Sequence, residues 1–124
     1  MDKILIVEDE ERNMKLVTDI LTMQGYYILQ ASNGAEGISI ALKERPSLIL
    51  MDIEMPVMDG LTALKKIRAN PDISHTRVVV ITARAMLGDE ERVMKAGADY
   101  YLAKPYKFQE LLSIVGRYCS ASKH

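Results

Sequence analysis

Acidic residues stand directly after two apolar segments of this chain. The run ILIV at residues 4–7 leads into Glu8 and Asp9, and the run LILM at residues 48–51 leads into Asp52. A continuous apolar run of this length is typical of a strand buried on both faces. Open α/β sheets place their ligands at the carboxyl ends of strands, and three acids cannot all stay ionised close together without a cation. The pattern therefore predicts a metal site in which one carboxylate could act as a nucleophile.

Two residues of complementary chemistry follow later apolar segments. Thr82 comes after VVVI at residues 78–81, and Lys104 comes after YYLA at residues 100–103. A threonine is often only a good strand residue, and a lysine before a proline is usually at the surface. A hydroxyl, an ammonium group and three acids at four strand ends together favour one common site.

The acids also have simpler interpretations. Asp52 could cap the helix that follows it, because aspartate is a good N-cap, although Asp59 fits the start of that helix better. Glu8 and Asp9 could merely favour the positive end of the next helix. Neither interpretation accounts for Thr82 and Lys104, so the common site is the stronger prediction.

Hydrophobic spacing predicts regular alternation of strands and helices along the chain. This alternation indicates a doubly wound α/β fold with a five-stranded parallel sheet, and fold analogy supplies the strand order 2-1-3-4-5. The fourth helix has only a thin apolar stripe. The predicted strands are 3–7, 27–31, 48–51, 78–81 and 100–103, and the predicted helices are 12–24, 34–44, 60–69, 86–96 and 107–118.

Bulk composition is ordinary for a globular protein. The 124 residues are 48% hydrophobic with a net charge of -1, so a single domain with a real core is expected. The charge predicts no direct nucleic-acid partner, and the apolar runs are too short for a membrane span. The lone Cys119 and the absence of a signal peptide before the first strand predict a cytoplasmic protein in which this thiol is a bystander.

In order and spacing, these motifs resemble the receiver domain of two-component response regulators, over about residues 3–118. The resemblance implies one receiver domain at residues 1–120 with a loose tail at 121–124, in a CheY-like, flavodoxin-like (βα)5 fold. The segment NMKL at 13–16 and the overall length resemble stand-alone receivers of the DivK type. The matching motifs are Glu8-Asp9, MDIEMPVMDG at residues 51–60, Thr82-Ala83 and Lys104-Pro105.

The resemblance implies that Asp52 is the phosphoacceptor and becomes an acyl phosphate. It further implies Mg²⁺ as the cofactor, with Mn²⁺ as an alternative, bound directly by Asp9 and Asp52 and through a water by Glu8. The backbone carbonyl of Glu54 would be another ligand. Few carboxylates and several waters suit magnesium, which requires six oxygens in near-octahedral geometry.

The same resemblance implies roles for residues of the fourth and fifth strands. Lys104 would pair with Asp52 before the reaction and with the phosphoryl group afterwards, and the bond from Lys104 to Pro105 would be cis. Thr82 would donate its hydroxyl to a phosphoryl oxygen. Tyr101 occupies the family's aromatic switch position and would turn inward when Thr82 is drawn toward the site. The plain alternative is that Tyr101 is a half-buried strand residue.

Two variable positions in the family tune the lifetime of the phosphate, and here they carry Glu54 and Arg84. We expect these opposite charges to pair and to restrict water, unless they are two solvated side chains worth little to each other. His75 lies in a polar loop segment, so it is interpreted as a surface residue; the phosphodonor histidine belongs to a partner.

The leading hypothesis is therefore a signalling switch, not a conventional enzyme, that catalyses only its own phosphorylation and dephosphorylation. Its expected partners are a histidine kinase or histidine phosphotransfer protein and a downstream protein effector, which would bind the fourth helix, the fifth strand and the fifth helix, with Tyr101 and Tyr106 among the contacts. We expect a monomer or weak dimer. The alternatives are a receiver excised from a hybrid kinase, an FMN-binding electron carrier and an aspartyl phosphatase. The acidic loop after the first strand argues against FMN, and the short loops leave no room for a phosphatase lid.

Overall fold

The computed structural model describes residues 2–53, 60–83 and 89–119, in which strands and helices alternate. Their bounds match the predicted elements to within one residue, except that α4 begins at Asp89, after a segment outside the described residues. The strands are β1 (Lys3–Val7), β2 (Tyr27–Ala31), β3 (Leu48–Asp52), β4 (Arg77–Thr82) and β5 (Tyr100–Ala103). The helices are α1 (Glu11–Met23), α2 (Gly34–Glu44), α3 (Gly60–Ala69), α4 (Asp89–Lys95) and α5 (Phe108–Tyr118).

The strands form one parallel sheet in the order β2-β1-β3-β4-β5, which confirms the predicted fold. The chain first moves outward from β1 to β2 and then returns, so that β3 pairs with the other edge of β1. In this register Val7 lies opposite Met51. The residues that follow, Glu8 and Asp52, therefore emerge side by side where the winding direction reverses, which is where open α/β sheets place ligands.

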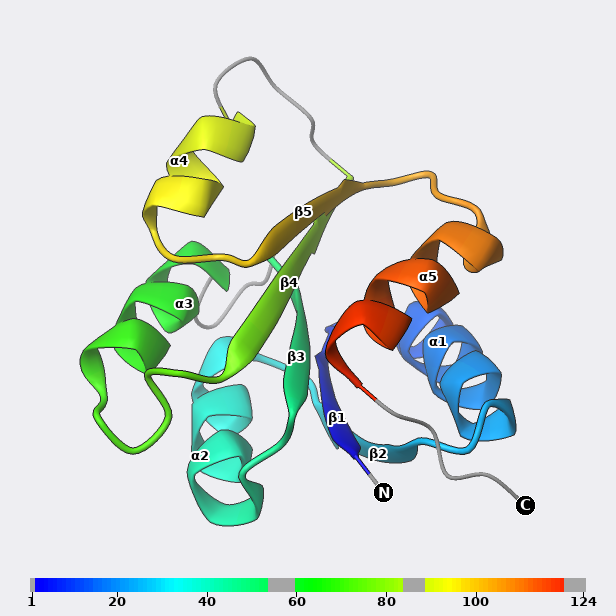
Figure 1. Ribbon diagram of the computed structural model, residues 1–124, viewed down its shortest axis with the longest axis horizontal. Helices are drawn as coiled ribbons and strands as arrows, with labels where there is room; N and C mark the ends of the chain where they lie inside the picture. Colours follow the sequence, from blue (N-terminus) through cyan, green and yellow to red (C-terminus); the bar gives the residue numbers. More distant parts are fainter. Residues whose placement is uncertain (1, 54–59, 84–88, 120–124) are drawn as a thin grey trace.

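Helices cover both faces of the sheet, with α1 and α5 on one face and α2, α3 and α4 on the other (Figure 1). Successive strand side chains point to opposite faces, and in the central strands β1, β3 and β4 both sets are buried. Leu5 and Val7 join one core with α2, α3 and α4, whereas Ile4 and Ile6 join a second core with α1 and α5. Burial on both faces explains why these strands are continuous apolar runs with no polar alternation.

Three expectations concern regions away from the strand ends. No helix in the described ranges has both the length and the apolar character that crossing a membrane requires. His75 is exposed in the turn after α3. Cys119 is buried at the end of α5, where burial, with a smaller contribution from the charge of Asp2, raises the pKa of its thiol to about 12. A protonated, buried thiol is unreactive.

Candidate functional site

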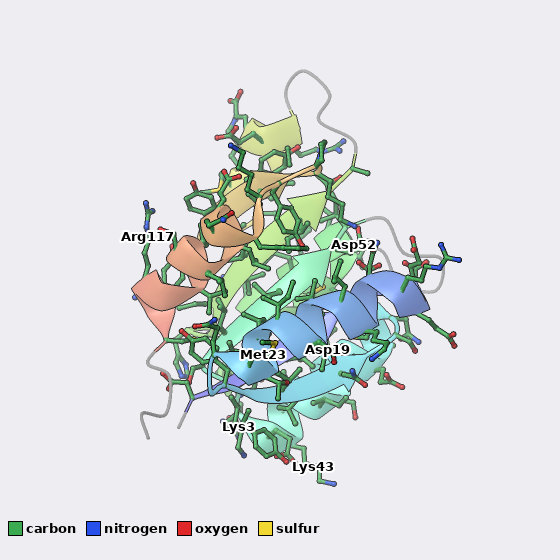
Figure 2. The ribbon with its side chains drawn as sticks, turned by 90° about the vertical axis from the view of Figure 1, so that its right-hand side faces the viewer. Lys3, Asp19, Met23, Lys43, Asp52 and Arg117 are labelled. Atoms are coloured by element: carbon green, nitrogen blue, oxygen red, sulfur yellow. The ribbon has the colours of Figure 1, made fainter. Side chains whose placement is uncertain are left out.

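The carboxyl end of the sheet brings the three predicted acids together. Glu8 and Asp9 directly follow β1, and Asp52 is the last residue of β3, at the opposite end of the sheet from Lys3 (Figure 2). One carboxylate oxygen from each acid lies within 4.8 Å of the other two. Asp52 is only 8% exposed, whereas Asp9 is open to solvent. This set of hard oxygen ligands, with one exposed side, is suited to a divalent cation such as Mg²⁺.

Lys104 projects its charge toward these acids from the end of β5. Its backbone N–H donates to the carbonyl of Thr82 at 2.8 Å, which continues the β4–β5 ladder by one residue. The ammonium Nζ lies 3.4 Å from Glu8 Oε1 and 3.9 Å from Asp52 Oδ2. The lysine is therefore closer to Glu8 than to Asp52, its expected partner. The Lys104–Pro105 peptide bond is cis, as the resemblance implies.

The electrostatics of Glu8 are unusual for a carboxylate. Burial raises its pKa from 4.5 to about 7, and the neighbouring Asp52 also raises it. The hydrogen bond from the Glu10 backbone N–H, at 3.2 Å, and the charge of Lys104 lower the pKa but do not cancel the rise. The charge of Lys104 therefore does not cancel the effect of burial on Glu8, so this carboxyl keeps affinity for a proton or for another cation.

Thr82 and Tyr101 lie on the two strands beyond Asp52. Asp52 is in register with Ile81, which makes Thr82, the fully buried last residue of β4, the next residue along that edge. Tyr101 is half-buried on β5 and packs against the core that includes Val93 of α4. The two predicted switch residues thus lie on adjacent strands, next to the site and to α4 respectively.

The first residue of α3, Gly60, lies against the backbone of the site. Its N–H donates to the carbonyl of Ile53 at 3.2 Å. A Cβ atom at this position would lie 2.4 Å from the carbonyl oxygen of Asp52 and 2.5 Å from the Cα of Ile53. Both neighbours are backbone atoms, so they cannot turn away as a flexible side chain could. Only glycine allows α3 to begin this close to the end of β3.

Two of the hollows beside the acids are lined by both Glu8 and Asp52. A polar one of about 410 Å³ is lined by the site residues and by Asn13 of α1, which the sequence analysis did not single out as a site residue. Only its spacing, one helical turn after Asp9, could have suggested this position. A more apolar cavity of about 520 Å³ extends between α1 and α5, where Tyr106 lines it. Tyr106 thus lies on the α1–α5 side and contacts the core there. Its burial, with a smaller effect of Glu8, raises the pKa of its hydroxyl.

Several predictions fall outside the described residues. These are the metal-ligating carbonyl of Glu54, the pairing of Glu54 with Arg84, and the loose tail at 121–124. They remain predictions.

The amino-acid sequence matches the response regulator receiver domain model over residues 4–116. The chain is 38% identical to the polar-differentiation response regulator DivK of Brucella anthropi, over 93% of this chain and 94% of that protein. It is 36% identical to DivK of Brucella ovis, with the same coverage.

Solved structures of receivers have the same fold. The receiver domain of the sensor histidine kinase PA1611 of Pseudomonas aeruginosa, with a magnesium ion coordinated in its active site cleft, has a TM-score of 0.87 at 36% identity, covering 94% of this chain and 96% of that one. The chemotaxis protein CheY4 of Vibrio cholerae has a TM-score of 0.89 at 28% identity, covering 96% and 99%. The chain therefore belongs to the response regulator receiver domain family.

Proposed function

We propose that this chain is a phosphorylation-controlled switch of a two-component system, in which Asp52 accepts a phosphoryl group. The observation that carries the proposal is the meeting of three carboxylates within 4.8 Å, with the Lys104 ammonium beside them, at the carboxyl end of the sheet. A structural ion pair would need one acid for one base. Three carboxylate oxygens gathered this closely are instead a set of hard ligands that suits a divalent cation.

Asp52 is the proposed nucleophile. One of its carboxylate oxygens attacks the phosphorus atom of a phosphohistidine on a partner protein, an O–P bond forms, and the P–N bond breaks with the electron pair returning to the imidazole. The low exposure of Asp52, 8%, limits the water around this carboxylate and around the acyl phosphate it becomes. Glu8 and Asp9 approach it from the neighbouring strand β1, whereas Asp52 is the last residue of β3.

The metal ligands would be Asp9, Asp52 and, through a water, Glu8, with the Glu54 carbonyl as a further ligand. Receiver structures similar to this chain contain Mg²⁺ in PA1611 and Mn²⁺ in Rcp1. Bound Mg²⁺ would offset the repulsion between these acids and the incoming phosphoryl oxygens. The raised pKa of Glu8 supports this assignment, because a carboxyl that holds a proton near neutral pH has a place for a cation.

Phosphorylation of Asp52 would be sensed by three nearby residues, Lys104, Thr82 and Tyr101. Lys104 lies within 3.9 Å of Asp52 and can follow the negative charge onto the phosphoryl oxygens. Thr82, at the end of the next strand, would donate its hydroxyl to a phosphoryl oxygen. Tyr101, packed against the core that contains Val93, would then change its position beside α4. Phosphorylation would shift an existing equilibrium between two arrangements and need not create a new one.

The proposed partners are a histidine kinase or histidine phosphotransfer protein as the donor and a protein effector as the target. The comparisons fit two settings, a stand-alone regulator similar to DivK and a receiver module similar to that of the kinase PA1611. The chemistry at Asp52 is the same in both. Phosphotransfer from separately purified kinases and phosphotransfer proteins would identify the donor.

The direct test is incubation with Mg²⁺ and a small phosphodonor, acetyl phosphate, followed by intact mass spectrometry. Wild-type protein should gain one phosphoryl group only when Mg²⁺ is present, and Asp52→Asn should gain none. Beryllium fluoride, which mimics the phosphoryl group, should shift the NMR signals of Ile53 and Ala83 in the wild type alone.

The substitution Asp9→Ala tests the metal site separately from the nucleophile, because it removes an exposed metal ligand and leaves Asp52 in place. The variant should keep its fold and lose most of its Mg²⁺ affinity. Equal modification of Asp52→Asn and wild type, or modification that is independent of Mg²⁺, would show that the proposed function is wrong.

A further inference from the structure

A network of hydrogen bonds centred on Arg68 joins α3 to the turn after α4. The Arg68 side chain is 22% exposed, and its guanidinium donates four hydrogen bonds. The acceptors are the carbonyl oxygens of Gly97 (2.8 Å), Ser74 (3.1 Å) and Thr76 (2.6 Å), and Asp99 Oδ2 (3.0 Å). One side chain thus joins the α3–β4 connection and the α4–β5 turn, at the end of the sheet opposite the acids.

Asp99 fixes the same turn to β4. Its carboxylate accepts from Arg68, from Arg77 at 3.1 Å and from the backbone N–H of Val78 at 2.8 Å. The backbone N–H of Asp99 in turn donates to the carbonyl of Val78 at 2.8 Å. Charge-assisted hydrogen bonds of this kind are stronger than neutral ones, so the turn at residues 96–99 is held firmly.

Gly97 shows how closely the turn and the arginine fit. Its φ of +113° is in the region that favours glycine. A Cβ atom here would lie 2.7 Å from Cγ of Arg68. A side chain at position 97 would therefore strain the backbone and displace Arg68 from its acceptors.

The body of α4 is held much less firmly. Among its described side chains, Val93 is the one that is fully buried, and Met94 is 40% exposed. By contrast, α5 buries Leu111, Ile114 and Val115. Figure 1 shows α4 at the outside of the fold, followed directly by the turn into β5. A helix with so little buried apolar surface is easily displaced, whereas the turn at its C-terminal end is not.

We propose that Arg68 makes the turn at residues 96–99 a fixed pivot about which α4 moves when Asp52 is phosphorylated. The proposal rests on the proposed function and adds Arg68 as a positioning residue, which lies at the end of β4 opposite to the acids. Arg68 takes no part in phosphoryl transfer; it determines which end of α4 can move.

Hydrogen exchange of backbone amides tests this pivot, because the four amides of the turn all donate hydrogen bonds. In the wild type, beryllium fluoride with Mg²⁺ should change the exchange of α4 amides while the amides of residues 96–99 stay within about twofold of their original rates. Arg68→Lys keeps the charge but loses the planar fork. Its turn amides should exchange about tenfold faster and should become sensitive to beryllium fluoride.

Two further variants complete the test. Lys65→Ala removes a charge from an exposed position on the same helix and should behave as wild type. Gly97→Ala should reproduce the Arg68→Lys pattern from the other side of the contact, and circular dichroism would verify that each variant is folded. Turn amides that respond to beryllium fluoride as strongly as α4 in the wild type, or turn exchange unchanged in Arg68→Lys, would overturn the pivot. If beryllium fluoride leaves the signals of Ile53 and Ala83 unshifted in the wild type, the proposed function fails and the pivot fails with it.

Discussion

In the described part of the chain, three carboxylates gather beside the Lys104 ammonium at the carboxyl end of the sheet, whereas at the opposite end the carboxylate of Asp99 has two guanidinium groups and a backbone N–H. Lys104 lies 3.4 Å from Glu8 and 3.9 Å from Asp52. Asp99 lies 3.0 Å from Arg68 and 3.1 Å from Arg77. Among the described residues, acids outnumber bases in the first arrangement and bases outnumber acids in the second.

This difference separates an acid that serves function from an acid that serves the fold. An acid whose hydrogen-bonding and charge requirements are met by the protein stabilises the folded state. Acids gathered with too little positive charge destabilise the folded state until a cation binds, which is usual for a binding site. Removing an acid should therefore have opposite effects on stability at the two ends.

The largest expected effect comes from disrupting the backbone of the carboxyl end with Gly60→Ala. The added methyl group would lie 2.4 Å from the carbonyl oxygen of Asp52, so either α3 or β3 must move. We expect the free energy of unfolding to fall by about 3 kcal/mol and Mg²⁺ affinity to fall with it. Urea denaturation and metal titration would measure both.

Gly116→Ala is the matched control for that substitution. A Cβ on this exposed α5 glycine meets nothing within 4 Å, so the change should raise the free energy of unfolding by about 0.5–1 kcal/mol through helix propensity. If Gly60→Ala proved as harmless as Gly116→Ala, the close approach of α3 to the site would be unimportant.

Asp99→Asn should have the next largest effect. The amide keeps the shape of the side chain but loses the charge that faces Arg68 and Arg77. Its single oxygen can replace either Oδ2, which accepts from Arg68 and Val78, or Oδ1, which accepts from Arg77, so at least one donor then faces an NH₂ group that cannot accept. We expect the free energy of unfolding to fall by about 2 kcal/mol, measured by urea denaturation. No loss of stability would mean that the arginines are satisfied without Asp99.

Glu8→Gln should have the opposite sign in metal-free protein. The folded-state pKa of Glu8 is raised from 4.5 to about 7, so between these pH values the folded protein holds a proton that the unfolded chain releases. As the pH rises through this window, the folded protein also loses that proton, and the contribution of Glu8 to the free energy of unfolding falls. Above it, Glu8→Gln should be more stable than wild type by about 1–2 kcal/mol, and near pH 4.5 the difference should vanish.

Thermal or urea denaturation in EDTA across pH 4.5–8 would measure this difference. Addition of Mg²⁺ should then stabilise wild type more than the variant, because the wild-type site keeps the charge that attracts the cation. If Glu8→Gln were less stable than wild type at every pH in EDTA, the ion pair with Lys104 would outweigh the burial of the carboxylate, and the comparison between the two ends would be wrong.

Most of the carboxyl end could be predicted from the sequence because its features are local. Each acid follows an apolar run, and parallel pairing brings such strand ends to one edge of the sheet. The order that makes β1 and β3 neighbours comes from fold analogy. The geometry within the site could not be predicted. The preference of Lys104 for Glu8 over Asp52, by 3.4 Å against 3.9 Å, depends on how side chains from three strands share a small space.

The opposite end could not be predicted, because its contacts join residues far apart in the chain. Arg68 and Asp99 are separated by 31 positions, and each has an ordinary local interpretation, as a basic residue in the last turn of α3 and as a polar residue before β5. A glycine after a helix, such as Gly97, is locally interpreted as a helix stop. The second reason for a glycine there, the space that Arg68 requires, appears only when α3 and the turn are packed together.

The smallest expected effect concerns an ion pair that has the same length as the one at Asp99. Lys15 Nζ lies 3.0 Å from Asp19 on α1, but these side chains are 78% and 58% exposed. Arg68 and Asp99 are also 3.0 Å apart, with exposures of 22% and 20% and with further partners. Asp19→Asn should lower the free energy of unfolding by only about 0.3 kcal/mol, and 0.5 M NaCl should abolish even that, because exposed charges are screened. Urea denaturation of Asp19→Asn beside Asp99→Asn, at low and high salt, compares the same substitution at two ion pairs of equal length. If the two substitutions cost the same, the length of the ion pair would decide its contribution, and the burial and shared partners of Asp99 would count for nothing.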